Sequence, residues 1–276
     1  MSNLAARLLT AAVLIPVLVV AIRWSNPVGV WAVVYLATFL GLREFYNMTM
    51  AKEPLAERGF AIALGLGFAA VVYWLDGQPM AVTASLAAMT LLGFLFYLFR
   101  YRTMETVAAR VTAMLAGTLY VGLLLTFVAL LKKRGPDGGA WVYITLTVTW
   151  FGDTGAYFAG RFIGPAWPVK LYESVSPKKT IIGALGGLAG SFGAMVLAKL
   201  WYLPSLSWTD CALVALPAGA LGQMGDLCES MLKRSVGVKD SGKLLPGHGG
   251  MLDRIDALLF SVPYIYCYAR WLYGHL

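Results

Sequence analysis

Charged residues are scarce in this chain of 276 residues. Asp, Glu, Lys and Arg make up 13% of the sequence, against about 25% in an average soluble domain. Hydrophobic residues make up 59%, and the mean hydropathy is +0.70. This balance excludes an ordinary soluble domain and predicts an integral membrane protein.

The sequence also has few cysteines and no pattern typical of membrane β-strands. The three cysteines, Cys211, Cys228 and Cys267, stand alone, without the spacing of a zinc site or a disulfide framework. The ten-residue alternation typical of membrane β-strands is missing as well. Because lipid leaves helices and closed barrels as the only ways to satisfy backbone polar groups, the predicted fold class is all-α.

What the sequence does contain is a series of apolar stretches, each close to the roughly 17–25 residues that cross a bilayer as a helix. We count nine, near 8–22, 28–50, 59–75, 79–99, 107–131, 140–162, 181–203, 208–232 and 254–275. Short connections join them, so we expect one integral membrane domain over 1–276. The first stretch lacks a small-x-small cleavage site and is expected to be retained.

The basic residues predict an orientation. With the N-terminus in the cytoplasm, nine spans place most of the 22 Lys and Arg residues on the inner side, as the positive-inside rule requires. The sequence "KKRGPDGG" at 132–139 disagrees with this orientation. The polar stretch at 230–256 would then face the cytoplasm.

Carboxylates interrupt the apolar stretches. Asp153 and Asp226 each lie inside one, where a charge costs at least about 2.5 kcal/mol. They are either functional residues, span-end residues or structural partners of a buried Arg. On a helix Asp226, Glu229, Ser230 and Lys233 fall on one face, and Asp253 and Asp256 begin the ninth stretch at the same i, i+3 spacing.

Two acidic rows at helix ends fit a divalent cation. Mg²⁺ accepts hard oxygen ligands, usually one or two carboxylates completed by waters and substrate oxygens. Between the rows lie several cations and the glycines of "PGHGG", which allow a phosphate to approach the backbone closely; these residues are Lys233, Arg234, Lys239, Lys243, Gly247, Gly249 and Gly250. The pattern predicts a polyphosphate site. The alternative is an ordinary positive-inside loop, which has no use for Asp226, Asp253 and Asp256.

The stretch "SMLKRSVGVKDSGKLLPGHGGMLDRID", residues 230–256, resembles the signature motif of phosphatidate cytidylyltransferases. The motif combines Lys-Arg, Lys-Asp-Ser-Gly, Pro-Gly-His-Gly-Gly and Asp-Arg-x-Asp at fixed spacing, and this stretch departs from it at none of these positions. The similarity extends to "GDLCES" at 225–230, "SPKKT" at 176–180 and "DTGAYFAGR" at 153–161. It therefore covers the half at about 140–276, and the spans of about 1–135 match only in being hydrophobic.

The resemblance implies a reaction between CTP and phosphatidate that yields CDP-diacylglycerol and pyrophosphate, in the phospholipid biosynthesis of a bacterial cytoplasmic (inner) membrane. It implies a catalytic set of Asp226, Asp253, Lys239 and Asp240, with Asp226, Asp253 and Asp256 as ligands of Mg²⁺ or Mn²⁺. The residues expected to bind substrate are Asp153, Ser176, Lys178, Lys179, Ser230, Lys233, Arg234, Lys243, Gly247, His248, Gly249, Gly250 and Arg254. His248 either contacts a phosphate or fills a turn.

The resemblance also suggests K⁺ near the divalent ion, a homodimer, contact with membrane lipids and no nucleic-acid partner. We expect Lys178 and Lys179 to open the seventh span behind Pro177, where first-turn N–H groups face a lipid phosphate. The small residues of "GALGGLAGSFGA" at 183–194 predict close packing with another helix, within this chain or in a second copy.

Other function classes fit the sequence less well. A polytopic transporter would also carry intramembrane carboxylates, but it should have paired, Gly/Pro-broken helices at the midplane, and the charge here gathers at one surface. A structural lipid protein would not require metal-ligand spacing. A CDP-alcohol phosphotransferase would carry an Asp-Gly-x-x-Ala-Arg run, which this sequence lacks.

Overall fold

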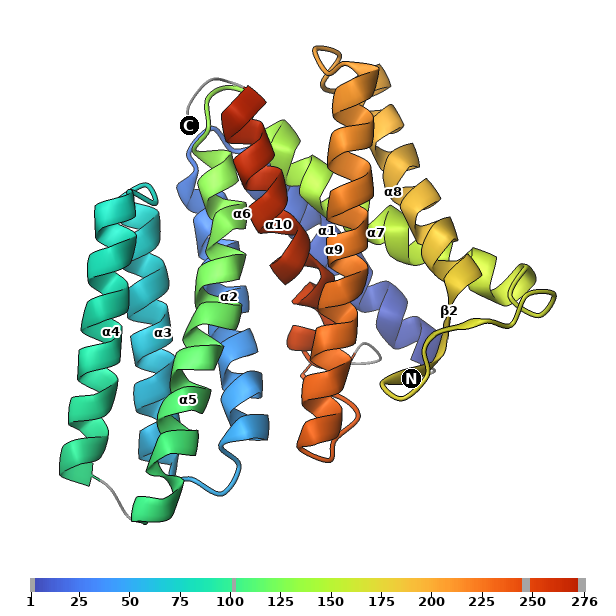
Figure 1. Ribbon diagram of the computed structural model, residues 1–276. Helices are drawn as coiled ribbons and strands as arrows, with labels where there is room; N and C mark the ends of the chain where they lie inside the picture. Colours follow the sequence, from blue (N-terminus) through green and yellow to red (C-terminus); the bar gives the residue numbers. More distant parts are fainter. Residues whose placement is uncertain (1–2, 101–102, 245–248, 273–276) are drawn as a thin grey trace. The chain divides into compact units, whose positions relative to one another are not determined.

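The computed structural model describes residues 3–100, 103–244 and 249–272, and these are predominantly helical (Figure 1). The elements of the N-terminal half are α1 (Asn3–Arg23), α2 (Val28–Thr49), α3 (Leu55–Trp74), α4 (Pro79–Arg100), the 3₁₀ turn η1 (Met104–Thr106), α5 (Val107–Gly117), the π-helical segment η2 (Thr118–Leu123) and α6 (Leu124–Lys132). Those that follow are α7 (Gly138–Phe162), β1 (Lys170–Tyr172), β2 (Ser176–Thr180), α8 (Ile181–Trp201), α9 (Trp208–Ser235) and α10 (Leu252–Leu272). The predicted all-α membrane fold is confirmed.

In the described part of the chain, fewer helices are apolar enough to cross a membrane than the nine that the sequence predicts. Among the described residues, six helical segments are long and apolar enough to cross a membrane: 28–49, 55–74, 79–100, 104–132, 181–201 and 208–235. The predicted spans at 140–162 and 254–275 coincide with α7 and α10 but do not reach that apolarity, and the predicted span at 8–22 corresponds to the shorter apolar stretch Ala12–Arg23. Both α7 and α10 carry charged residues at the ends where we predicted chemistry, so the count of nine is approximate.

The chain packs as two compact units. The first comprises the described residues within Met1–Ala21, Asn26–Leu130 and Asp240–Asp253, and the second those within Ile22–Ser25, Leu131–Lys239 and Arg254–Leu276. Residues 240–253, which belong to the signature motif, therefore pack with the N-terminal helices. Along the sequence, one boundary between the two units falls in the first turn of α10, between Asp253 and Arg254.

The first unit is a helical bundle in which α2 packs against α3 and α5, and α4 against α3 and α5 (Figure 1). The fully buried Tyr46 ties α2 to α5, because its hydroxyl donates to the Met114 carbonyl over 2.7 Å. A buried ion pair joins α5 to α3, with Arg110 Nη1 lying 3.2 Å from Glu57 Oε2. The Tyr46 contact fixes α2 against α5, and the ion pair fixes α5 against α3.

Close glycine contacts organise the second unit, in which α8 packs on both α7 and α9. A Cβ at Gly155 would overlap the Gly186 carbonyl, and one at Gly190 would overlap the Phe151 carbonyl. Ser191 adds a hydrogen bond of 3.0 Å to the Val148 carbonyl. The small-residue stripe at 183–194 thus packs against α7 within this chain.

The segment before α8 differs from the prediction. Ser176, Pro177, Lys178 and Lys179 lie on β2, which pairs antiparallel with β1, and they do not open a helix. The helix α8 begins at Ile181, where the Thr180 side chain caps it by accepting from Gly183 N–H over 3.1 Å. A Thr that caps the first turn marks a helix start as well as a Pro does, and here the Thr determines it.

Candidate active site

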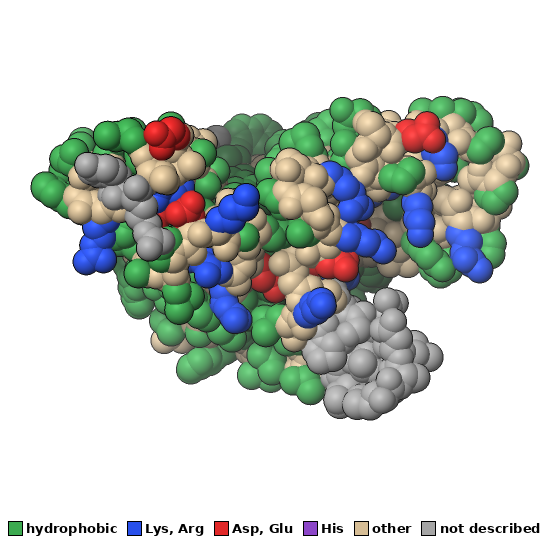
Figure 2. Space-filling view, turned by 90° about the horizontal axis from the view of Figure 1, so that it is seen from below, with side chains coloured by type: hydrophobic (Ala, Val, Ile, Leu, Met, Phe, Trp, Pro, Cys, Tyr) green, Lys and Arg blue, Asp and Glu red, His purple; other side chains and the backbone are tan. Residues whose placement is uncertain are grey.

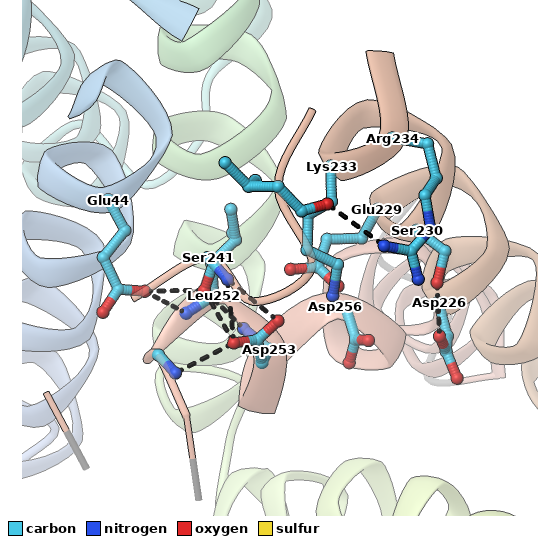
Figure 3. Close-up of polar contacts among 12 residues, drawn as sticks. Glu44, Asp226, Glu229, Ser230, Lys233, Arg234, Ser241, Leu252, Asp253 and Asp256 are labelled. Atoms are coloured by element: carbon cyan, nitrogen blue, oxygen red, sulfur yellow. Dashed lines mark hydrogen bonds and ion pairs between the residues drawn. The ribbon is translucent and has the colours of Figure 1, made fainter. Parts of the chain in front are cut away.

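Asp226 lies near the C-terminal end of α9, in the second unit (Figure 3). Its Oδ2 is 2.6 Å from Lys179 Nζ on β2, and the Ser230 hydroxyl lies 3.4 Å from its Oδ1. Both side chains of the ion pair are about one-third exposed, at 28% for Lys179 and 35% for Asp226. The hairpin therefore delivers one cation of "SPKKT" directly to the carboxylate that we predicted as a metal ligand.

One turn further along α9, Glu229 and Lys233 form a buried pair. Lys233 Nζ lies 2.5 Å from Glu229 Oε2, and Glu229 is fully buried. This i, i+4 arrangement follows directly from the predicted helical face. Because Glu229 compensates its charge, Lys233 is suited to hold the end of α9 in place more than to receive a phosphate.

Further carboxylates of the second unit lie within electrostatic range of Asp226. Asp256, in the first turns of α10, interacts with Asp226, Glu229 and Asp153, and Arg254 interacts with Asp153. The backbone of α10 comes very close to α9 here, because a Cβ at Gly225 would lie 2.5 Å from the Asp256 carbonyl. Like charges at close range repel one another, and a bound cation would relieve that repulsion.

Asp253 belongs to a separate hydrogen-bond network in the first unit (Figure 3). Its Oδ2 accepts from Gly250 N–H over 2.9 Å, from Ser241 N–H over 3.1 Å and from the Ser241 hydroxyl over 3.0 Å. The Gly250 N–H, which we predicted to face a phosphate, donates to this carboxylate. The network ties Ser241 and Gly250 to the first turn of α10 at Asp253.

Glu44 of α2 is the residue that the sequence reading missed. Its Oε2 accepts from Leu252 N–H over 2.9 Å and from the Ser241 hydroxyl over 3.0 Å. Glu44 is only 7% exposed. A signal was present, since Glu44 is a carboxylate inside an apolar stretch, like Asp153 and Asp226.

The remaining predicted cations are accessible. Arg234, Lys239, Lys243 and Arg254 are exposed, as is Asp240. Arg234 also donates to the Val238 carbonyl over 3.1 Å, and Lys243 lines a cavity of about 280 Å³ in the first unit with Arg43, Asn47 and Ser241. Lys and Arg side chains are plentiful on the face drawn in Figure 2. Exposed cations of this kind can neutralise phosphate charge.

Five predicted substrate residues remain, two in "SPKKT" and three in "PGHGG". Lys178 is exposed on β2, and Ser176 is half-buried at its start. Gly249 has a positive φ of 81°, which suits glycine, and a Cβ there would lie 2.9 Å from Asp253 Oδ2. Gly247 and His248 lie outside the described residues.

The donor chemistry fits a divalent cation, although the described residues contain no group of three or more His, Cys, Asp or Glu side chains in metal-binding geometry. Mg²⁺ requires only one or two carboxylates from the protein when substrate phosphates and waters supply the rest. Asp226 and Asp256, which lie within electrostatic range of each other, carry such oxygens.

A profile of the cytidylyltransferase family matches residues 5–272. The chain belongs to this family. A phosphatidate cytidylyltransferase of Brucella suis is 34% identical over 269 residues, covering 97% of this chain and 94% of the relative. One of Synechocystis sp. is 33% identical over 264 residues, covering 85% and 86%, and one of Bacillus subtilis is 38% identical over 151 residues, covering 54% of each. The resemblance predicted from the motif is confirmed.

Proposed function

We propose that this cytidylyltransferase transfers the cytidylyl group of CTP to phosphatidate and so forms CDP-diacylglycerol and pyrophosphate. The observation that carries the proposal is the near-full-length similarity to proteins named phosphatidate cytidylyltransferase. An all-α membrane fold suits a lipid substrate. Exposed cations and clustered carboxylates suit a nucleotide with its phosphates.

The chemistry calls for little acid–base catalysis. A phosphate oxygen of phosphatidate attacks the α-phosphorus of CTP, and the bond from that phosphorus to the oxygen shared with the β-phosphorus breaks. Pyrophosphate leaves with the electron pair. The nucleophile is already anionic at neutral pH, so the protein contributes by aligning the two anions and neutralising their charge.

We infer that Mg²⁺ or Mn²⁺ binds at Asp226 and Asp256, with Asp253, one helical turn before Asp256 on α10, as a third candidate ligand. When bound, such an ion would stabilise the charge that develops on the leaving pyrophosphate. Lys179 holds Asp226 Oδ2 in a fixed direction. The K⁺ suggested by the resemblance remains part of the proposal.

The phosphate-binding role falls to the exposed cations, which we assign as Arg234, Lys239, Lys243 and Arg254. Lys178, Ser176 and the half-buried Gly249 stay candidates for substrate contact. We further propose that the site faces the cytoplasm of a bacterial inner membrane and that the enzyme is a homodimer. A cysteine placed at Lys243, after removal of the native cysteines, should react with an impermeant maleimide only in inverted membranes.

The proposed function is tested with purified full-length protein in detergent. Tritiated CTP should enter the lipid extract when phosphatidate is present, and diacylglycerol, which lacks the phosphate nucleophile, should not replace it. Incorporation that is independent of phosphatidate, or equal with diacylglycerol, would refute the proposal. Because a detergent solution has no sealed compartment, turnover there also excludes a transporter as the explanation.

A further inference from the structure

Glu44 places a negative charge inside the helical bundle of the first unit. Desolvation of a carboxylate is costly unless hydrogen bonds compensate it. Here the compensation comes from the far end of the chain, from Leu252 N–H and the Ser241 hydroxyl, which are 208 and 197 residues away. These two donors flank the loop that carries Lys243 and the glycines of the signature motif.

Ser241 lies between two carboxylates. Its Oγ is 3.0 Å from Glu44 Oε2 and 3.0 Å from Asp253 Oδ2, and it also accepts from Asp253 N–H over 3.3 Å. A hydroxyl has one proton and can donate it to one acceptor at a time. The orientation of Asp253 is thus linked to Glu44 through a single side chain.

Two motif glycines allow the loop to close around Glu44. A Cβ at Gly242 would overlap Glu44 Oε1, and a Cβ at Gly250 would overlap both Glu44 Oε2 and the Ser241 hydroxyl. A side chain at either position would push the backbone away from α2. The "DSG" and "GHGG" glycines are explained by this close approach to a carboxylate of the protein itself.

We propose that Glu44 is a positioning residue for cytidylyl transfer: it holds both ends of the 240–252 loop through Ser241 and Leu252 and so sets the direction of the Asp253 carboxylate. This inference rests on the proposed function. The hydrogen bonds, and not the charge, are the means by which Glu44 acts. Glu44 itself contacts neither the reacting atoms nor a metal in this assignment.

Two conservative variants of Glu44 distinguish the effect of side-chain length from the effect of charge. Glu44→Gln keeps an amide oxygen that can take the place of Oε2 and accept from both Leu252 N–H and the Ser241 hydroxyl, without the negative charge. Glu44→Asp keeps the charge but retracts it by roughly 1.5 Å, one carbon–carbon bond, beyond hydrogen-bond distance of both donors. Glu53→Asp is the matched control, because Glu53 pairs with Arg110 in the same unit.

We expect Glu44→Asp to lower kcat by about 10- to 100-fold, the scale of a small misplacement of a catalytic group, with both KM values within about 3-fold of the parent. Glu44→Gln and Glu53→Asp should stay within about 3-fold in kcat. Normal kcat in Glu44→Asp would overturn the proposal. So would a Glu44→Gln variant as impaired as Glu44→Asp, because charge would then be the cause.

Hydrogen–deuterium exchange gives a readout that does not depend on turnover. Peptides covering 240–253 should exchange about tenfold faster in Glu44→Asp than in the parent, Glu44→Gln or Glu53→Asp proteins, because the loop opens locally. Unchanged exchange would show that Glu44 does not hold the loop. Failure of the parent protein to use CTP and phosphatidate would refute the proposed function, and the exchange result would still decide what Glu44 does.

Discussion

The molecule contains two carboxylate clusters built from similar residues in opposite ways. In the first unit, backbone N–H groups and one hydroxyl surround Glu44 and Asp253, so that a single oxygen of Asp253 lies within hydrogen-bond distance of two N–H groups and of the hydroxyl that it shares with Glu44. In the second unit, Asp226 and Asp256 lie within electrostatic range of one another, and Lys179 is the cation that offsets Asp226.

The comparison indicates which carboxylates hold the structure and which are ready to bind a cation. A carboxylate that is surrounded by donors is held in a fixed direction, whereas carboxylates that repel one another gain most from a bound metal. We therefore propose that the metal binds at the Asp226 cluster and that the Glu44 network positions the loop.

Removal of divalent metal should have the largest effect. EDTA is expected to reduce cytidylyl transfer to background, because the charge on the leaving pyrophosphate loses its partner. Excess Mg²⁺ or Mn²⁺ should restore the rate, as measured by pyrophosphate release. Full activity in a thoroughly chelated, metal-free preparation would show that the Asp226 cluster holds no catalytic metal. The proposed difference between the two clusters would then be wrong.

Loss of the Asp226 charge comes next. Asp226→Asn should lower the rate by about 100-fold or more, the scale of a lost transition-state contact. Asp210→Asn on the same helix is the control, since Asp210 belongs to the capping box with Ser207 at the other end of α9. The control should keep its turnover and lose about 1 kcal/mol of stability. Equal losses in the two variants would indicate a general effect of damage to α9.

A serine in each cluster sharpens the contrast. Ser241→Ala removes the hydroxyl between Glu44 and Asp253 and should lower kcat about 10-fold through misplacement of Asp253. Ser230→Ala removes a longer contact of 3.4 Å to Asp226 and should cost about 2-fold. Steady-state kinetics with both substrates measures the difference. A larger effect at Ser230 would reverse the roles assigned to the two networks.

The two lysines of the hairpin should differ the least. Lys179→Gln is expected to lower kcat about 5-fold, because Lys179 orients Asp226, whereas the exposed Lys178→Gln should raise the KM for phosphatidate about 3-fold at unchanged kcat. Assays at fixed surface dilution separate the two constants. Identical kinetics for the two variants would mean that the ion pair with Asp226 does not affect catalysis.

The sequence predicted the helices well because a bilayer demands long apolar stretches, and the structure has a helix at each of them. The Asp226 face of α9 was readable for a similar reason, since residues four apart on a helix must meet. The hairpin at 170–180 was missed because two short strands rich in Lys leave no periodic pattern.

Glu44 stood out as a carboxylate inside an apolar stretch, but its hydrogen-bond partners could not be predicted. Its partners lie about two hundred residues away, and no local spacing connects "LREFY" with "DSGK". Only the packing of residues 240–253 with the N-terminal helices brings them together. The sequence likewise did not predict which helix packs against the small residues at 183–194. Glycine spacing indicates that a helix packs closely, but it does not identify the neighbouring helix.

The most direct test of cytidylyl transfer uses CTP labelled at individual phosphorus atoms. Purified protein with phosphatidate should transfer ³²P from the α-position of CTP into the lipid fraction and release ³²P from the γ-position as pyrophosphate, one for each lipid labelled. Asp226→Asn should abolish both signals and Asp210→Asn neither. Label from the γ-position in the lipid would identify a kinase-like reaction and contradict cytidylyl transfer.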